Sequence, residues 1–554
     1  MSTRNISRSD LDHTARTRFG WDDLQDGQIE AVEALLSGRD VLAVMPTGYG
    51  KSAIYQLAAA LLGGVTVVVS PLIALQTDQV ANLAELPDAP AAVAINSALR
   101  PAAVEAAWER VSGPNGGIVY VAPEQLAKDE TVERLRGLGV TLFAVDEAHC
   151  VTAWGHDFRP DYLRLGDVIE RLGHPRTVAL TATGSTPVRR DIAERLRLRD
   201  PLELTRGFDR PNLVLQVTRH IEENDKERAV LEQVLELPKP GLLYVATRAD
   251  TERFAAALAD RGLRAAGYHG GLRAADRRSV HDDFSSDRLD VVVATSAFGM
   301  GIDKANVRFV VHAAVPESVD AYYQEIGRAG RDGEPATAAL HYRSEDLGLR
   351  KFFATRRPDD EALRRAYNVI ARSKEPVSSA QLARDIDSST RTATGLVNAL
   401  ADAGMVRSDR RGSRATGTAT ARKAAAAAVE GIEERERIEA SRLDMMRGYA
   451  ETTECRRLFL LGYFGEQHFE PCDNCDVCSR AEGARTAPLE DEPGSDAPEQ
   501  DGPFAPQASV THKEWGAGTV MRVEADRVTV FFEHEGYKVL SLELVADGKL
   551  LQPA

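Results

Sequence analysis

Cysteine is scarce in this chain of 554 residues: there are five, and four of them fall between positions 455 and 478. Such a small, clustered set excludes a disulfide-rich secreted scaffold and favours a metal site in a reducing cytoplasm. Long apolar runs are also missing, because the longest, 53–75, contains Gly63-Gly64 and Pro71. It predicts a helix, a turn and a buried strand instead of a membrane span. The first ten residues lack the apolar segment of a signal peptide, so we expect a cytoplasmic protein.

Positive charge is in short supply as well. The chain has 68 basic and 84 acidic residues, a net charge of −16, which argues against a nucleic-acid partner unless basic residues gather locally. Only 11 of the basic residues are lysines, so a lysine in a candidate site indicates that a compact ammonium group is needed there. Hydrophobic residues at 43% and charged residues at 27% predict a packed globular protein, and its length predicts several domains.

Short β-branched runs alternate with helical stretches from about position 40 to 341, for example at 65–70, 117–122, 141–146 and 291–296. This pattern predicts an α/β fold with two RecA-like domains, each a doubly wound parallel sheet covered by helices on both faces. We place the first domain at 1–206 and the second at 207–350, with 241–247 as the first strand of the second.

The character of the sequence changes after position 350. Two short amphipathic helices precede a strand, a basic turn and a strand, which is the layout of a winged helix. Later, an acidic stretch rich in Pro, Gly and Ala is not expected to order itself, and alternating strands with turns at Gly516, Gly518 and Gly536 predict a small β-barrel. We expect the linker helices and the winged-helix-like insert at 351–431, and a helical zinc-binding module at 432–480. The acidic linker is expected at 481–507 and the barrel at 508–554.

The segment MPTGYGKS, 45–52, lies between an apolar strand and a helix, where backbone N–H groups and the helix dipole can hold phosphate. Lys51 would reach the β- and γ-phosphates of ATP, and the Ser52 hydroxyl would bind Mg²⁺. Met45 stands where the strict P-loop pattern has glycine, so a helix cap beside a glycine turn is the alternative. The turn itself would be made by Thr47, Gly48 and Gly50.

Two further elements complete a candidate ATPase site. In AVDEAHC, 144–150, Asp146 can hold Mg²⁺ and Glu147 can polarise the attacking water. In QEIGRAGRDG, which starts at Gln324, we expect Arg328 and Arg331 to lie one helical turn apart on a common face and to stabilise transition-state charge. Surface arginines with salt-bridge partners are the alternative for this last segment.

In this order, the three elements resemble a superfamily 2 helicase, and other segments narrow the resemblance to the RecQ type. FGWDDLQDGQ, 19–28, resembles the family's motif 0, which implies adenine contacts from Trp21 and Gln28. Gln25 stands where arginine is usual, and LTATGS, 180–185, resembles the coupling motif III. By resemblance, Asp303 in the second domain would face the nucleotide.

The resemblance also implies a path for single-stranded DNA. VVVSPLIALQTDQV, 67–80, resembles motif Ia, and CVTAWGHDFRPDYL, 150–163, is similar to the RecQ aromatic-rich loop. Its rings can stack on bases, although a packed core loop is the alternative. The implied DNA contacts are Ser70, Trp154, His156, Phe158, Arg159, Arg248, His269 and Thr295.

The four clustered cysteines, Cys455, Cys472, Cys475 and Cys478, can close a tetrahedral shell around Zn²⁺. Their flanking segments are similar to the RecQ zinc module, which implies a structural site, and a redox CxxC pair is the alternative. Two departures from RecQ stand out: the winged-helix-like segment precedes the zinc module, and no HRDC domain is recognisable after it.

The predicted wing is basic, with Arg407, Arg410, Arg411 and Arg414 against one acid, Asp409. It predicts duplex DNA binding, with solvated arginines on a hairpin as the alternative. The barrel resembles the Tudor-like barrel of some bacterial superfamily 1 helicases, which implies a protein partner, such as RNA polymerase or a repair protein.

The resemblance therefore implies an ATP-, Mg²⁺- and Zn²⁺-dependent DNA helicase that moves 3′-to-5′ on single strands, unwinds tailed or forked duplex, and acts in repair and recombination at the nucleoid. The alternatives are a translocase that does not separate strands, a scaffold with a vestigial motor, and a superfamily 2 RNA helicase. The intact ATPase residues argue against the scaffold.

Overall fold

The computed structural model forms two compact units, Met1–Arg343 with Met446–Pro498, and Ser344–Met445 with Glu499–Ala554. Each unit is described by itself. The barrel thus groups with the winged-helix segment, and the part of the zinc module from Met446 onward, which holds the four cysteines, groups with the two α/β domains. The structure describes residues 8–71, 73–97, 99–113, 115–152, 160–298, 304–348, 359–409, 412–466, 470–485, 504–524, 526–545 and 550–553.

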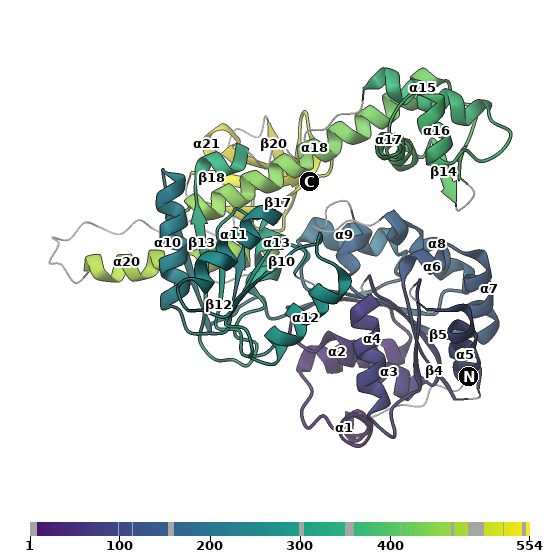
Figure 1. Cartoon of the computed structure of the whole chain (residues 1–554), viewed down its shortest axis with the longest axis horizontal. Helices are drawn as coiled ribbons and strands as arrows, with labels where there is room; N and C mark the ends of the chain where they lie inside the picture. The colour runs from purple at the N-terminus through teal and green to yellow at the C-terminus, as the bar shows by residue number, and fades with distance from the viewer. Residues whose placement is uncertain are drawn as a thin grey trace. The chain divides into compact units, whose positions relative to one another are not determined.

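The first domain is built on a seven-stranded parallel sheet of order β3-β4-β2-β5-β6-β1-β7. Helices cover both faces (Figure 1), so the central strands are buried along nearly their whole length and are apolar runs in the sequence. Its strands are β1 (Val41–Val44), β2 (Gly64–Val69), β3 (Ala92–Ile95), β4 (Gly116–Val121), β5 (Val140–Val145), β6 (Arg176–Thr181) and β7 (Leu202–Thr205). Its helices are α1 (Arg8–Thr14), α2 (Asp26–Ser37), α3 (Lys51–Leu62), α4 (Ile73–Ala84), α5 (Pro101–Val111), α6 (Pro123–Leu126), α7 (Asp129–Leu138), α8 (Leu165–Arg171) and α9 (Thr186–Arg195).

The second domain has a six-stranded parallel sheet of order β10-β11-β9-β12-β13-β8. The prediction that 241–247 forms its first strand is wrong, because β8 precedes that segment. β8 is an edge strand with alternating burial, so it lacks the continuous apolar run that marks the central strands. The elements are β8 (Leu213–Arg219), α10 (Glu223–Glu236), β9 (Gly241–Tyr244), α11 (Arg248–Ala259), β10 (Ala265–Tyr268), α12 (Ala274–Ser285), β11 (Val291–Ala294), β12 (Phe309–His312), α13 (Val319–Ile326) and β13 (Ala336–Tyr342).

The zinc module returns the chain to the α/β domains through the long helix α18 (Ala421–Glu451) and the shorter α19 (Arg456–Phe464) and α20 (Asp476–Arg485). At this junction the Tyr342 hydroxyl donates to Glu451 at 2.6 Å, so the chain leaves and re-enters this unit at neighbouring points. α20 extends to Arg485, so the first residues of the segment 481–507, expected to lack order, are helical.

The winged-helix segment has α15 (Asp360–Arg372), α16 (Ser379–Asp385), α17 (Thr390–Asp402), β14 (Val406–Asp409) and β15 (Gly412–Ala415). The two predicted short helices are capped by Ser378 and Ser389, the residues just before them, whose hydroxyls accept hydrogen bonds from the third backbone N–H beyond each serine. Their apolar faces share one core with α15 and with Ala424 and Ala425 of α18. The predicted helix-helix-hairpin layout is confirmed.

The C-terminal barrel is a five-stranded antiparallel sheet of order β19-β18-β17-β16-β20. Its elements are β16 (Ser509–His512), β17 (Gly516–Val523), β18 (Arg527–Phe532), β19 (Gly536–Ser541), α21 (Leu542–Val545) and β20 (Leu551–Pro553). The predicted turn at Gly518 is wrong, because this glycine lies inside β17, where a Cβ would stand 2.7 Å from the ring of Phe532. The glycine is thus needed for close packing within the sheet.

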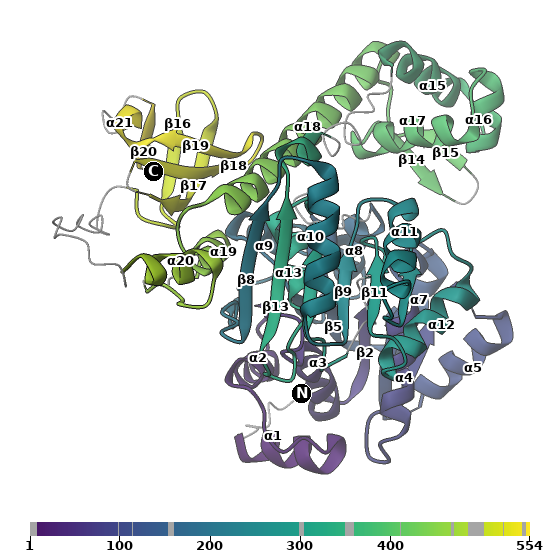
Figure 2. The ribbon, with the colours of Figure 1, turned by 60° about the vertical axis from the view of Figure 1, so that its left-hand side comes forward.

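The barrel lies along α18 (Figure 2). His534 contacts Glu434 at 2.6 Å, and Arg437 donates to the His534 carbonyl at 3.3 Å. Gly536 has φ +75°, and a Cβ there would stand 2.1 Å from the Ser441 hydroxyl. These contacts hold the barrel against the helix. Among the described residues, every helix is too short or too polar to cross a membrane.

Candidate active site

The phosphate-binding turn lies between the end of β1 and the start of α3. Gly48 and Gly50 both have positive φ, +89° and +77°, which glycine adopts without strain. A Cβ at Gly50 would stand 2.6 Å from Nε2 of Gln28. The first N–H groups of α3 are therefore presented beside a compact turn, as phosphate binding requires.

Lys51 is the first residue of α3, and its ammonium donates to the carbonyls of Met45 at 2.9 Å and Pro46 at 3.2 Å. Burial lowers the pKa of Lys51, while the nearby carboxylates of Glu147 and Asp146 act in the opposite direction. The cation is thus held inside the turn and beside the acidic pair, where a phosphate bound to the turn would meet it.

Asp146 and Glu147 follow the carboxyl end of β5 directly. Burial and the neighbouring charge of Glu147 raise the pKa of Asp146 to about 7, against the opposing effect of Lys51. Glu147 has φ +49°, an uncommon conformation for a non-glycine residue that occurs preferentially at functional sites. Two crowded carboxylates at the end of a buried strand suit the binding of a divalent cation, which would relieve their repulsion.

The arginine-bearing segment approaches the phosphate-binding turn from the second domain. A Cβ built on Gly48 would lie 3.4 Å from Cγ of Arg331, and the Arg331 charge contributes to lowering the pKa of Lys51. Arg328 is 3% exposed and Gln324 is 8% exposed. The expected helical spacing of the two arginines is wrong: α13 ends at Ile326, and they lie in the following turn, where Gly330 has φ +59°.

The residues predicted to bind adenine lie on the amino-terminal side of the same turn. Trp21 stacks on Phe19 with ring centroids 4.5 Å apart, and it packs against the core of the first domain. Gln28 accepts a hydrogen bond from the Gln25 backbone and donates to the carbonyls of Tyr49 at 2.9 Å and Gly50 at 3.0 Å. This link between motif 0 and the P-loop was not foreseen, and the adenine contacts stay predictions.

Three residues predicted to face DNA, Arg248, His269 and Thr295, follow the carboxyl ends of β9, β10 and β11, which are neighbours in the sheet. A Cβ on Gly271 would stand 2.8 Å from the Arg248 guanidinium and 3.1 Å from the His269 ring, so both side chains lie against Gly271. Ser70 is only 2% exposed at the end of β2, which does not suit direct contact with DNA.

The predicted sites that lie outside the described residues are Trp154, His156, Phe158, Arg159, Asp303, Arg410 and Arg411.

Tyr162 was not recognised as part of the site. It is fully buried near the carboxyl end of the aromatic-rich loop, and its hydroxyl donates to the carbonyl of Asp146 at 3.3 Å. The loop's exit is therefore fixed to the residue that we assign to the metal. In the sequence, the role of Tyr162 is indicated only by its place near the end of the segment CVTAWGHDFRPDYL.

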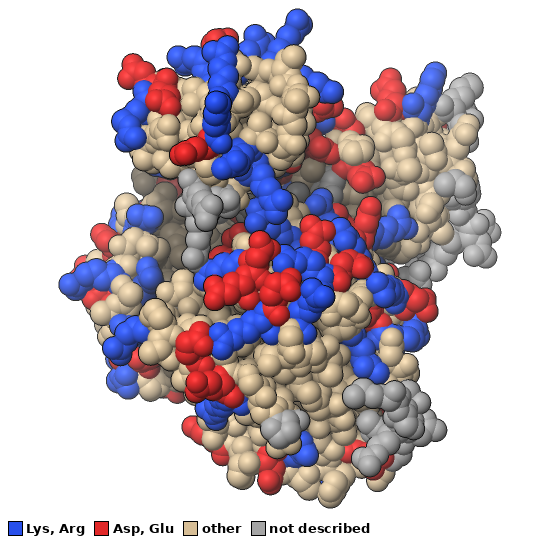
Figure 3. Space-filling model, turned by 90° about the vertical axis from the view of Figure 1, so that its right-hand side faces the viewer, with Lys and Arg blue, Asp and Glu red and all other residues tan. Residues whose placement is uncertain are grey.

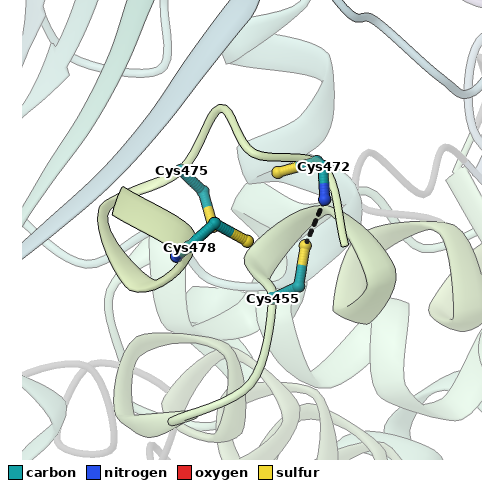
Figure 4. Close-up of side chains that lie close together, drawn as sticks. All are labelled: Cys455, Cys472, Cys475 and Cys478. Atoms are coloured by element: carbon teal, nitrogen blue, oxygen red, sulfur yellow. Dashed lines mark hydrogen bonds between the residues drawn. The ribbon is translucent and has the colours of Figure 1, made fainter. Parts of the chain in front are cut away.

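The four predicted zinc ligands converge at one point (Figure 4), and their sulfur atoms all lie within 4.8 Å of one another. A tetrahedral shell with Zn–S distances of about 2.3 Å separates the sulfurs by about 3.8 Å, so the cluster fits Zn²⁺. Backbone N–H groups of Cys472 and Cys478 donate to the sulfurs of Cys455 and Cys475, which favours thiolates. The arrangement is closed by four protein ligands, as in structural zinc sites.

Basic side chains are prominent over the winged-helix segment, at the top of Figure 3, with acidic ones among them. Arg407 and Arg414 are directly opposite each other across the β14–β15 hairpin, and both are exposed. Two like charges face to face repel each other, which favours an anionic partner over the hairpin.

Together these features define a nucleotide-driven motor with two RecA-like domains and an attached zinc module. The DEAD/DEAH box helicase family matches residues 25–191, the helicase conserved C-terminal domain matches 225–333, and the RecQ zinc-binding family matches 417–479. A family of unknown function, DUF3553, matches 508–547, the barrel.

Relatives identify the family. The chain is 38% identical over 342 residues to the probable ATP-dependent DNA helicase RecS of Bacillus subtilis, covering 62% of this chain and 68% of that protein. It is 34% identical over 461 residues to the ATP-dependent DNA helicase RecQ of Pasteurella multocida, covering 83% and 61%. The chain belongs to the RecQ-type family of ATP-dependent DNA helicases. It spans 58% to 62% of the length of the bacterial RecQ proteins it matches.

The fold agrees with this assignment. The crystal structure of the DUF1998 helicase MrfA matches with a TM-score of 0.51 at 17% identity, covering 76% of this chain and 64% of that one. The similarity shows a shared arrangement of the helicase domains.

Proposed function

We propose that this chain hydrolyses ATP to move 3′-to-5′ along single-stranded DNA and to separate the duplex ahead of it. The observation that carries the proposal is the approach of Arg331, from the second domain, to the P-loop residue Gly48 of the first. An arginine that reaches a phosphate site from another domain can sense the γ-phosphate and stabilise charge during its transfer. DNA is proposed as the substrate because the relatives of this chain are named as DNA helicases.

The residues divide the work of hydrolysis among them. The P-loop N–H groups and Lys51 hold the phosphates, and Ser52 and Asp146 would hold Mg²⁺, which neutralises phosphate charge when bound. Glu147 orients and deprotonates the attacking water. Arg328 and Arg331 complete the site when the two domains close on ATP and withdraw when they separate, which would move the DNA-binding edges relative to each other.

Single-stranded DNA would run along the carboxyl edge of the second sheet, past Arg248, His269 and Thr295. Their positions after neighbouring parallel strands support this path. We further propose that Trp154 and Phe158 stack on bases and report DNA binding to the ATPase site through Tyr162 and its bond to Asp146.

The direct test compares ATP turnover with single-stranded DNA, duplex DNA and RNA, and strand separation on duplexes with a 3′ or a 5′ tail. We expect stimulation by single-stranded DNA and unwinding of the 3′-tailed duplex. Turnover without strand separation would indicate a translocase, stimulation by RNA alone an RNA helicase, and no turnover a vestigial motor.

Two variants assign the chemistry. Lys51→Ala should abolish turnover while leaving most DNA affinity, and Glu147→Gln should still bind ATP but hydrolyse it about 10²- to 10⁴-fold more slowly, as expected for loss of a general base. Strong DNA-stimulated ATPase in either variant would contradict the site assignment.

We also propose that the barrel binds a protein partner, such as RNA polymerase or a repair protein, and that the chain acts in DNA repair and recombination at the nucleoid. Exposed Val539 and Leu544 on the barrel support a protein contact. Deleting 481–554 should leave ATPase and unwinding near normal but remove a co-purifying protein from cell extracts. Loss of unwinding on a simple tailed duplex would instead place the barrel in the motor.

A further inference from the structure

The segment 206–212, which we call the hinge, joins the two RecA-like domains without a helix or strand. Residues 208–211 of this hinge contact the zinc module. Phe208 in this hinge is 1% exposed, and its ring stacks on that of Phe464, the last residue of α19, at 4.4 Å with an interplanar angle of 8°. The Phe208 N–H donates to Glu466 at 3.1 Å. Both the ring and the N–H of this hinge residue are thus held by the zinc module.

A second set of contacts secures the carboxyl side of the hinge. The Arg457 guanidinium, at the start of α19, donates to the carbonyls of Arg210 at 3.1 Å and Leu213 at 3.0 Å. Asn474, between two zinc ligands, donates to the carbonyl of Pro211 at 3.0 Å. These bonds give the hinge carbonyls their partners, so the zinc module helps to determine the path of the hinge backbone.

The hinge in turn holds the loop that carries the catalytic arginines. The Arg210 side chain donates to the carbonyls of Ala329 and Gly330, both at 2.9 Å, between Arg328 and Arg331. Tyr323, on the helix before this loop, donates to the Phe208 carbonyl at 2.7 Å, and its ring lies 4.8 Å from that of Phe464.

The same module also reaches the first domain. Arg189, on α9, donates both to the carbonyl of Phe464 at 3.3 Å and to that of Gly184 in the LTATGS segment at 3.2 Å. α19 therefore bonds to the hinge and to segments on both sides of it.

We propose that Phe464 and Arg457 are positioning residues for ATP hydrolysis: through the hinge they set where Arg328 and Arg331 stand relative to the phosphates. The inference rests on the proposed ATPase. The zinc module then contributes to the transition state of hydrolysis in addition to its own stability, although it supplies no group to the nucleotide. A few tenths of an ångström at a guanidinium matter because transition-state stabilisation depends on fixed geometry.

The test uses the full chain and a matched pair of variants on α19. Phe464→Leu keeps an apolar side chain of similar size but removes the ring that stacks on the hinge. Phe459→Leu makes the same change at a phenylalanine that packs on Tyr449 of α18. A second pair, Arg457→Gln and Arg480→Gln, compares the hinge-binding guanidinium with one that pairs with Asp476 inside the zinc module.

We expect Phe464→Leu and Arg457→Gln to lower kcat tenfold or more, while KM for ATP and zinc per chain stay within twofold of the parent. Binding of ADP with aluminium fluoride, which mimics the phosphoryl group in transit, should weaken tenfold or more, and binding of a non-hydrolysable ATP analogue should not. The two control variants should match the parent in every measurement.

Equal kcat in Phe464→Leu and Phe459→Leu would overturn the inference. So would a loss of zinc or of ATP-analogue binding in step with kcat, because that result indicates a role in folding alone. A parent protein without ATPase activity would contradict the proposed function itself, and the two failures are therefore distinguishable.

Discussion

The imidazole of His149 meets the hydroxyl of Thr181 at 3.0 Å, and so joins the DEAH segment to the strand that leads into LTATGS. The Thr181 hydroxyl gives its proton to the carbonyl of Thr183 at 2.7 Å, so it accepts from the Nδ1–H of His149. His149 also lies 3.4 Å from the Glu147 carboxylate. A change in the LTATGS segment can thus reach the residue that activates water.

Thr181→Val tests this link, because valine keeps the shape of threonine and removes the hydroxyl. Losing the hydrogen bonds that the Thr181 hydroxyl makes with His149 and Thr183 should cost about 0.5–1.5 kcal/mol each. We expect the DNA-stimulated rate of ATP hydrolysis to fall more than the basal rate. Thr181→Ser, which keeps the hydroxyl, is the control, and an equal loss of both rates in the valine variant would contradict a coupling role.

The zinc content provides the second prediction. The purified protein should carry one Zn²⁺ per chain, and Cys475→Ser should lower zinc content and solubility together, because the metal supplies much of the folding energy of so small a module. Mass spectrometry of the metal measures the zinc content, and the soluble fraction after centrifugation measures the solubility, with Cys150→Ser as control for both. Cys150 is fully buried in the first domain, away from the cluster. Active protein without zinc would contradict the assignment.

The wing should bind the backbone of duplex DNA. Replacing Arg410, Arg411 and Arg414 with alanine should weaken binding to tailed duplex and reduce the slope of log K against log salt by about 0.9 per lost phosphate contact. Affinity for single strands should barely change. Arg228→Ala is the control, because the Arg228 side chain is 68% exposed on α10 of the second domain. An unchanged salt slope would indicate that these arginines are merely solvated.

A pH effect on stability follows from His341. Burial, with contributions from the charges of His220 and Lys226, lowers the pKa of His341 to about 3. The unfolded chain binds a proton below about pH 6.5 and the folded protein does not, so stability is lost as the pH falls below that value. Between pH 7.5 and pH 5 the loss should be about 2 kcal/mol from this residue.

Urea midpoints at the two pH values measure this effect. His341→Gln should show a smaller shift than the parent, because glutamine does not titrate and can still bond to Gln233, which His341 contacts at 2.7 Å. Equal shifts in the two proteins would show that other groups carry the pH dependence.

The phosphate-binding turn after β1, the acidic pair after β5 and the cysteine cluster could be predicted from the sequence, because the residues of each stand close together in the chain. The hinge contacts could not, because Arg457 and the Arg210 carbonyl are 247 positions apart and the pattern around each is that of an ordinary helix or loop. β8 was missed for a related reason: at the edge of a sheet only alternate side chains are buried. Gly518 was predicted to be a turn residue. Its glycine is explained by the ring of Phe532, which leaves no room for a side chain at this position in β17.

The hydrogen bond between Tyr342 and Glu451 has a consequence for insertions between these two residues. The ends of the intervening stretch, which holds the winged-helix segment, are already joined by this bond within the motor unit. Lengthening a flexible loop whose ends are fixed costs only about 0.6 kcal/mol for each doubling of its length. A lineage could therefore gain, lose or exchange a whole domain at this position without disturbing the order in which the motor and the zinc module assemble.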